Sequence, residues 1–166
     1  MTTIDGIKYA HSLGLPALDM GAAHNRPAGY LGVDQYPHPN VDIVCDVSEG
    51  IPMDDSSVGV IRAHDFIEHI PDSVALFNEF YRVLAPEGLL LIQVPSTDGR
   101  GAFQDPTHVS FWNENSFWYY TNPQYRAFVP TIACDFEALA LDTVFPSAWH
   151  VRWNVPYVIA TLKANK

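Results

Sequence analysis

Short apolar runs recur along the chain and alternate with polar segments. Five of them precede residue 95, at residues 15–20, 30–34, 41–45, 58–63 and 89–94. Four are rich in β-branched or bulky apolar residues and are bounded by Gly, Pro, Asp or Asn, which is typical of buried parallel strands. We therefore expect this part of the chain to form the strands of a parallel sheet.

One segment between the fourth and fifth runs has the periodicity of a helix, in PDSVALFNEFYRVLAPEG at residues 71–88. Its apolar residues fall on one helical face. They are Val74, Phe77, Phe80 or Tyr81, and Leu84. Asp72 or Ser73 can cap its start, and Pro86 with Gly88 ends it. The spacing predicts a helix that connects two neighbouring strands.

After residue 94 the alternation stops. Residues 95–135 are irregular, with nine aromatic residues between positions 103 and 128, which indicates a packed lid rather than disorder. Two further strand candidates, residues 136–145 and 155–163, can pair as an antiparallel hairpin. The pattern predicts one α/β domain over residues 1–166, with a Rossmann-like, mostly parallel sheet and a C-terminal antiparallel hairpin.

Composition narrows the function classes. The 166 residues are 48% hydrophobic and 13% aromatic, which excludes a disordered chain, and no apolar run is long enough to span a membrane. Cys45 and Cys134 form no C-x-x-C motif, and the N-terminus does not resemble a secretory signal, so we expect a cytoplasmic protein with reduced thiols. The net charge of −10 disfavours nucleic acid as a partner.

Carboxylates and an imidazole follow three of the expected strands. Asp34 ends the second, Asp46 follows the third, and His64 with Asp65 follows the fourth. Ligands of open parallel sheets bind outside the carboxyl ends of the strands. Asp34 is suited to accept both hydroxyls of a ribose, and Asp46 to accept from an adenine amine. A single aspartate at a strand end is more often a turn former, but three sites along one edge favour ligand binding.

Four stretches follow one another in this order: LDMGAA, YLGVD, DIVCDVSEGIPMDDSSVGVIRAHDFIEHIPD and FNEFYRVLAPEGLLLIQVPS. Together they resemble the class I S-adenosylmethionine-dependent methyltransferases, of type 11, over residues 15–96. The resemblance implies a seven-stranded sheet whose last strand is antiparallel, an enzyme, and S-adenosylmethionine as cofactor. It also implies a role for each matching residue. Each role is a place along the bound cofactor: the methionine end for Asp19, Gly21 and Ala22, the ribose for Asp34, the adenine for Asp46 and Val47, and the sulfonium for His64.

The chain departs from the family pattern between its first two strands. DMGAAHNR has one glycine where three are common, and too few residues remain for the usual first helix. A shortened subset of the family is similar in GYxxVD and EHI, so we expect a methyltransferase fold with pruned N-terminal helices. Two alternative functions stay open. One is a non-catalytic relative that serves as a cofactor-binding, oligomerising or regulatory module. The other is a nicotinamide-dependent oxidoreductase, although this chain lacks the G-x-G-x-x-G fingerprint of that class.

HDFIEHI places Asp65, Glu68 and His69 at i, i+3 and i+4, on one face if the segment is helical. This is similar to the acidic-x-x-Glu-His pattern of metal-assisted O-methyltransferases, in which a later histidine completes the site, and His108 is the candidate. The resemblance implies a divalent metal held by Asp65, Glu68, His69 and His108. The alternative is that Glu68 and His69 only cap and pack the helix.

The loop after the fifth strand carries the candidates for acid–base chemistry. A hydroxyl acceptor must lose its proton, and histidine suits that task near neutral pH. We nominate His108 as the base, oriented by Asp105, with His69 as second candidate; the alternative is a turn in which His108 packs against Trp112. The neighbouring aromatic residues can line an acceptor pocket, form core, or make a homodimer contact. We expect methylation of a small molecule or glycan, at oxygen.

Overall fold

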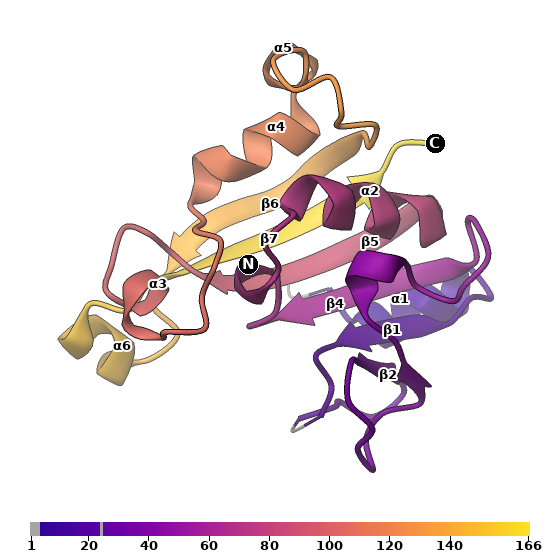
Figure 1. The fold of residues 1–166 in the computed structure, drawn as a ribbon, viewed down its shortest axis with the longest axis horizontal. Helices are drawn as coiled ribbons and strands as arrows, with labels where there is room; N and C mark the ends of the chain where they lie inside the picture. The colour runs from indigo at the N-terminus through magenta and orange to yellow at the C-terminus, as the bar shows by residue number, and fades with distance from the viewer. Residues whose placement is uncertain (1–3, 24) are drawn as a thin grey trace.

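A seven-stranded sheet runs through the computed structural model, which describes residues 4–23 and 25–166 (Figure 1). The strands are β1 (Ala17–Met20), β2 (Leu31–Asp34), β3 (Ile43–Val44), β4 (Val58–His64), β5 (Leu84–Pro95), β6 (Phe136–Val144) and β7 (Tyr157–Ala164). Their order is β3-β2-β1-β4-β5-β7-β6; β7 runs antiparallel to both of its neighbours, β5 and β6, and the other pairings of the described strands are parallel. The predicted mostly parallel sheet with a C-terminal antiparallel hairpin is confirmed.

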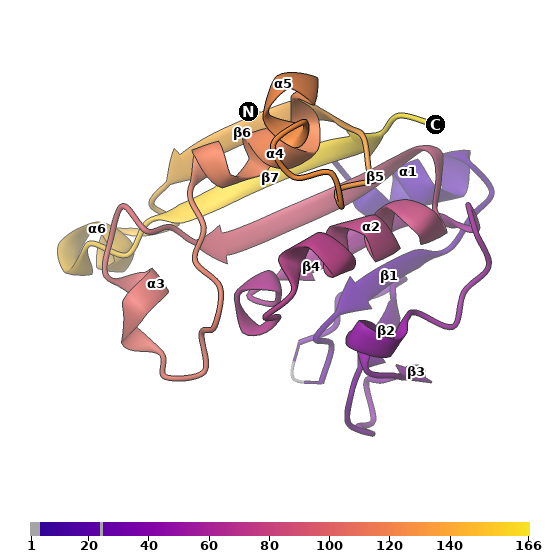
Figure 2. The ribbon, with the colours of Figure 1, turned by 45° about the horizontal axis from the view of Figure 1, so that its top comes forward.

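Helices cover the two faces of the sheet unequally. They are α1 (Gly6–Ser12), α2 (Ser73–Val83), α3 (Gly101–Gln104), α4 (Trp118–Thr121), α5 (Pro123–Arg126) and α6 (Ala148–Trp153), with 3-10 turns η1 (Val47–Glu49), η2 (Ile67–His69) and η3 (Glu114–Phe117). Figure 2 shows α1 behind the sheet and α2 in front of it. Among the described residues, no helix has the length and apolarity that crossing a membrane requires.

The predicted helix between β4 and β5 is α2. The carboxylate of Asp72 accepts a hydrogen bond from Ala75 N at 2.9 Å and so caps its start. Its end differs from the prediction: the helix stops at Val83, and Leu84 already has extended backbone and begins β5. Pro86 and Gly88 lie in β5, where the pairing with β4 shifts register, instead of ending the helix.

Phe77 of α2 joins the helix to the aromatic-rich segment. Its ring stacks on Tyr120 at 4.0 Å and on Trp112 at 5.5 Å between centroids, and Phe117 makes an edge contact. All four side chains are buried. This part of residues 95–135 is therefore core, one of the alternatives left open by the sequence, whereas Phe111, Trp118 and Tyr119 of the same segment are exposed.

The connections between β1, β2 and β3 are short. No helix occurs between β1 and β2 in residues 21–23 and 25–30, as the spacing indicates. The chain after β2 turns back across Gly32, where a Cβ atom would overlap the carbonyl oxygen of Asn40. The carboxylate of Asp42 accepts from Gly32 N at 2.8 Å and pairs with Arg26 at 2.5 Å. Hydrogen bonds thus hold this edge where a longer chain would use a helix.

Candidate functional site

A cavity of about 400 Å³ lies at the carboxyl ends of β1, β2 and β4. Four of the seven predicted cofactor residues line it: Gly21, Asp34, Asp46 and Val47. Asp65 and His69 complete the wall on the β4 side. The edge of the sheet expected from the sequence to bind ligand is therefore hollow.

Local backbone chemistry shapes this cavity. Gly21 has a φ of +72°, which favours glycine, and its N–H donates to Val33 O at 2.9 Å. Asp34 accepts from Tyr36 N at 3.0 Å. Asp46 accepts from the hydroxyl and backbone N–H of Ser48, and these bonds lower the pKa of its carboxyl. Both aspartates therefore form turns and also line the cavity, and their role in binding a ligand stays a prediction.

Asp19 and Ala22 do not line this cavity. Asp19 is 1% exposed, and its Oδ1 lies 2.5 Å from Nη1 of Arg62 on the neighbouring strand β4. Burial raises the pKa of Asp19, and the Arg62 guanidinium opposes that rise. Ala22 is fully buried against β2 near Gly32. The acid predicted for the methionine end of the cofactor is thus already paired within the sheet.

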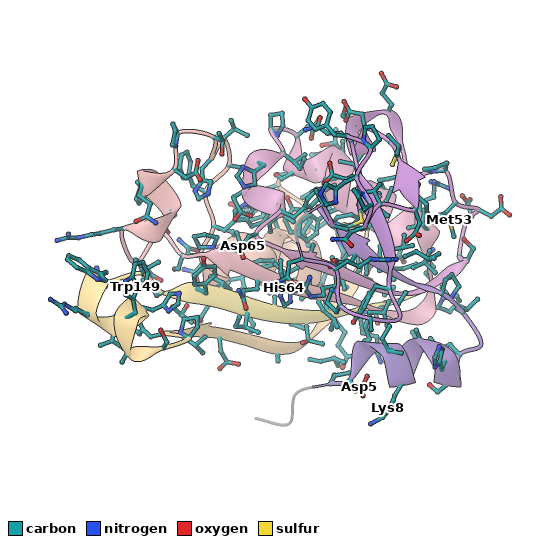
Figure 3. All side chains as sticks on the ribbon, turned by 90° about the horizontal axis from the view of Figure 1, so that it is seen from below. Asp5, Lys8, Met53, His64, Asp65 and Trp149 are labelled. Atoms are coloured by element: carbon teal, nitrogen blue, oxygen red, sulfur yellow. The ribbon has the colours of Figure 1, made fainter. Side chains whose placement is uncertain are left out.

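His64 also lies elsewhere. Its Nδ1 is 2.9 Å from Nη2 of Arg62, and both side chains line a different cavity of about 810 Å³, on the face that carries α1. Burial and the Arg62 charge lower the pKa of His64 to about 4. Figure 3 labels His64 and its neighbour Asp65 near the middle of the molecule. Asp65 follows the last residue of β4 and lines the 400 Å³ cavity, whereas His64 does not.

A second cavity of about 240 Å³ adjoins the first and shares Asp65 and His69 with it. Most of its polar lining can exchange a proton or bind a cation. These residues are Asp65, Glu68, His69, Asp105, His108 and Tyr157. The structure therefore brings together every residue nominated for catalysis or metal binding, and adds Tyr157.

Glu68 is the most deeply buried residue of this group. It is 2% exposed, and within the described residues neither of its carboxylate oxygens has a hydrogen-bond partner. Burial, with smaller contributions from nearby acidic groups, raises the pKa of Glu68 to about 8. Its backbone oxygen accepts from Val109 N at 2.9 Å and Ser110 N at 3.0 Å, which ties the loop carrying His108 to η2.

The two histidines are held by carbonyl oxygens. His108 Nδ1 lies 2.9 Å from Ala102 O, and His69 Nδ1 lies 3.2 Å from Thr107 O. A carbonyl only accepts, so each Nδ1 carries a proton, and in the neutral form of each ring Nε2 is the acceptor. His108 Nε2 lies 4.0 Å from Glu68 Oε1, and the two rings are 5.0 Å apart between centroids.

Asp105 supports the site differently from the prediction. Its Oδ1 accepts from the backbone N–H of Thr107 at 2.8 Å and from the Thr107 hydroxyl at 2.6 Å. That hydroxyl lies 3.2 Å from His69 Nδ1. Asp105 therefore positions His69 through Thr107, while the Ala102 carbonyl orients His108.

Asp65 stands apart from the other metal candidates. Glu68, His69 and His108 bring one ligand atom each to within 4.8 Å of one another, and Asp65 is not in this group. The 3-10 turn η2 begins only at Ile67, so the expected helical spacing from Asp65 does not apply. Burial raises the pKa of the Asp65 carboxyl, and the nearby Tyr157 hydroxyl opposes that rise.

Comparison with known proteins finds a matching domain family for part of the chain and a matching fold for nearly all of it. Residues 18–92 match the family described as a methyltransferase domain. This stretch, which is less than half of the chain, is similar to methyltransferase domains. A probable S-adenosylmethionine-dependent methyltransferase of Mycolicibacterium smegmatis is 33% identical over 75 residues, which are 43% of this chain and 29% of that protein. The match therefore spans less than a third of this relative.

Solved structures extend the likeness to nearly the whole chain. The 1,6-didemethyltoxoflavin-N1-methyltransferase of Burkholderia thailandensis, with its substrate and S-adenosylhomocysteine bound, has a TM-score of 0.60 at 20% identity, over 96% of this chain and 76% of that one. The cyclase SpnF has a TM-score of 0.58 at 14% identity, over 91% and 74%. At such identities the likeness shows the fold alone, and a cyclase on the same fold makes the reaction a separate question.

Proposed function

We propose that the chain binds S-adenosylmethionine in the 400 Å³ cavity and transfers its methyl group to an acceptor held in the adjoining 240 Å³ cavity. The observation that carries this proposal is the shared wall of Asp65 and His69. With its ribose at Asp34 and its adenine at Asp46, the cofactor would extend along that wall, and its sulfonium would face the acceptor. The match of residues 18–92 to methyltransferase domains supports the same reaction.

We infer that the acceptor atom is a hydroxyl oxygen. In the transfer, the oxygen bonds to the methyl carbon, the carbon–sulfur bond breaks, S-adenosylhomocysteine leaves, and the hydroxyl proton must be removed. Nε2 of His108 is the first candidate for that base, with His69 second, because each Nδ1 donates to a carbonyl oxygen and Nε2 is the acceptor of the neutral ring beside the cavity. The small, acid-lined cavity and the net charge of −10 support a neutral small molecule or sugar.

One observation favours the rival, a non-catalytic relative. Arg62 pairs with Asp19, so the acid expected at the methionine end of the cofactor is already occupied. Such a module would bind cofactor weakly or not at all and would turn over no acceptor. The two hypotheses therefore separate on cofactor affinity first and on turnover second.

Isothermal titration calorimetry with S-adenosylmethionine and S-adenosylhomocysteine tests the proposal. We expect Asp34→Ala to weaken binding about 10- to 100-fold, because hydrogen bonds to a charged group contribute about 1.5–3 kcal/mol. Asp142→Asn is the matched control, since Asp142 is a half-buried aspartate of β6 that lines a different cavity. Absence of binding to the unaltered chain at millimolar cofactor would overturn the proposal in favour of the non-catalytic module.

A further inference from the structure

Exposed apolar side chains gather at one end of the molecule, where the short helices α3 and α6 lie. Figures 1 and 2 both show the two helices at that end. The backbone N–H of Arg100, just before α3, donates to the carbonyl oxygen of Asn154, just after α6, at 2.8 Å. Five large apolar side chains on and beside these helices are 46% to 62% exposed, and we call them the apolar end: Phe103, Phe111, Trp149, Val151 and Trp153. Such a group on neighbouring elements is typical of an interaction surface.

Contacts within the molecule do not cover these side chains. The ring of Phe103 stacks on that of Phe111 at 5.2 Å between centroids, and both stay at least half exposed. Trp149 and Trp153 are four positions apart on α6, so they share one face of that helix. Figure 3 shows Trp149 at an outer end of the molecule, well away from Asp65 near its middle. The apolar end is therefore available to a partner.

The charges beside the apolar end differ from those of the chain as a whole. Of the nine Lys and Arg residues, Arg100 and Arg152 are the two whose side chains, within the described residues, make neither an ion pair nor a hydrogen bond. The Arg152 guanidinium instead lies 5.3 Å from the ring centroid of Trp153. Asp98 and Asp105, in the segments next to α3, accept hydrogen bonds within their own turns. Two unpaired cations thus flank the exposed apolar side chains of an acidic chain.

We propose that the apolar end, with Arg100 and Arg152, docks on the surface of an anionic lipid bilayer. Tryptophan and other aromatic side chains favour the interface between lipid and water, and arginine pairs with phosphate groups. The net charge of −10 does not prevent this contact, because at an ionic strength of about 0.15 M charges more than about 8 Å away are largely screened. A second copy of the chain is a poorer occupant, since a two-fold contact would bring the arginines of both copies together.

The same two helices border the 240 Å³ cavity assigned to the acceptor. Gly101 and Gln104 of α3 line it, as do Val155 and Tyr157, which follow α6. A docked chain would therefore hold that cavity beside the lipid head groups. On the proposed function, on which this step alone rests, the acceptor hydroxyl would belong to the neutral or sugar head group of an amphiphile whose tail stays in the bilayer. Lipid binding itself requires neither cofactor nor acceptor.

Co-sedimentation of the whole chain with lipid vesicles tests the proposal without cofactor. We expect binding to vesicles of phosphatidylcholine with about 30% phosphatidylglycerol, and weaker binding to phosphatidylcholine alone. Replacing both tryptophans, Trp149→Ser with Trp153→Ser, should weaken binding by at least about 10-fold, because their rings no longer enter the interface. Arg100→Gln with Arg152→Gln should weaken binding to the anionic vesicles about 10- to 30-fold and leave binding to phosphatidylcholine alone unchanged.

Two matched controls remove the same kinds of side chain elsewhere. Phe128→Ser alters an aromatic residue that is 77% exposed, just after α5, which lies apart from α6 in Figure 1. Lys8→Gln removes an exposed cation of α1, and Figure 3 shows Lys8 and Trp149 well apart. Both controls should bind vesicles as the unaltered chain does. Circular dichroism shows that each variant folds, as expected for substitutions of exposed side chains.

Two results would overturn the proposal. One is the absence of co-sedimentation of the unaltered chain at millimolar lipid, and the other is equal affinity in the controls and in both double variants. If vesicle binding is absent and analytical ultracentrifugation shows a dimer that the tryptophan variant dissociates, a second copy is the occupant instead. Titration with S-adenosylhomocysteine separates this surface from the proposed function, since a chain that binds vesicles but no cofactor would refute only the proposed function.

Discussion

His64 makes the stability of the fold depend on pH by an amount that follows from its surroundings. Burial and the adjacent Arg62 lower its pKa from 6.5 to about 4 in the folded chain. Between pH 6.5 and pH 4, the unfolded chain therefore binds a proton at His64 that the folded chain does not bind. The stabilisation from neutral His64 is present above pH 6.5 and is lost as the pH falls toward 4.

The size of the effect can be worked out. The full difference between the two pKa values corresponds to about 3 kcal/mol, of which about 2 kcal/mol falls between pH 7 and pH 5. His64→Asn places an amide oxygen near the position of Nδ1, so it can still accept from Arg62, but it does not titrate. We expect the variant to lose about 2 kcal/mol less than the unaltered chain between these two pH values.

Urea unfolding at pH 7 and pH 5 measures both chains. Asp19, Asp65 and Glu68 have raised pKa values and change stability in the opposite direction. These three residues are present in both chains, so their contributions to the pH dependence of the unfolding free energy cancel when the two chains are compared. An equal change of unfolding free energy in the two chains would refute the placement of a neutral His64 beside Arg62.

Two further predictions concern the packing that supports the site. Phe77→Ala should lower the free energy of unfolding by about 3–5 kcal/mol, because it empties the centre of the aromatic cluster around Trp112 and Tyr120, and Phe77→Leu should cost less; urea titration measures both. Asn78→Ala should cost about 1–3 kcal/mol, since its carboxamide bonds Thr131 O, Ala133 N and Cys134 N. Limited proteolysis should then cleave near residues 129–135 first, and unchanged protection there would contradict the assigned role.

Much of the sheet could be predicted because its buried strands have apolar runs of their own. The run at residues 58–63 became β4 with one residue added, whereas β3 is reduced to two residues at the edge. The helix α1 gave no apolar signal, because its buried residues are Gly6 and Ala10. The start of β5 was missed because Pro86 and Gly88 look like a helix end but lie in a bulged strand.

The candidate site also contains some residues that a local sequence pattern predicts and others that it does not. Gly21, Asp34 and Asp46 could be predicted because a strand followed by a turn is a local pattern. The pairing of Asp19 with Arg62 joins residues 43 positions apart, and no local pattern contains it. Tyr157 reaches the site because β7 pairs with β5, opposite Pro95, and that register depends on the whole sheet.

The place of β7 in the sheet has a consequence for how the chain folds. It follows every other strand in sequence, yet it lies between β5 and β6, and within the described residues β6 pairs with no other strand. During synthesis β5 therefore has an open edge, which invites pairing with other chains, until residues 157–164 have emerged. Leu89 then pairs with Lys163 across more than seventy residues, and such distant contacts form slowly. The pairing of β7 with the open edge of β5 is expected to be the late, rate-limiting event of folding.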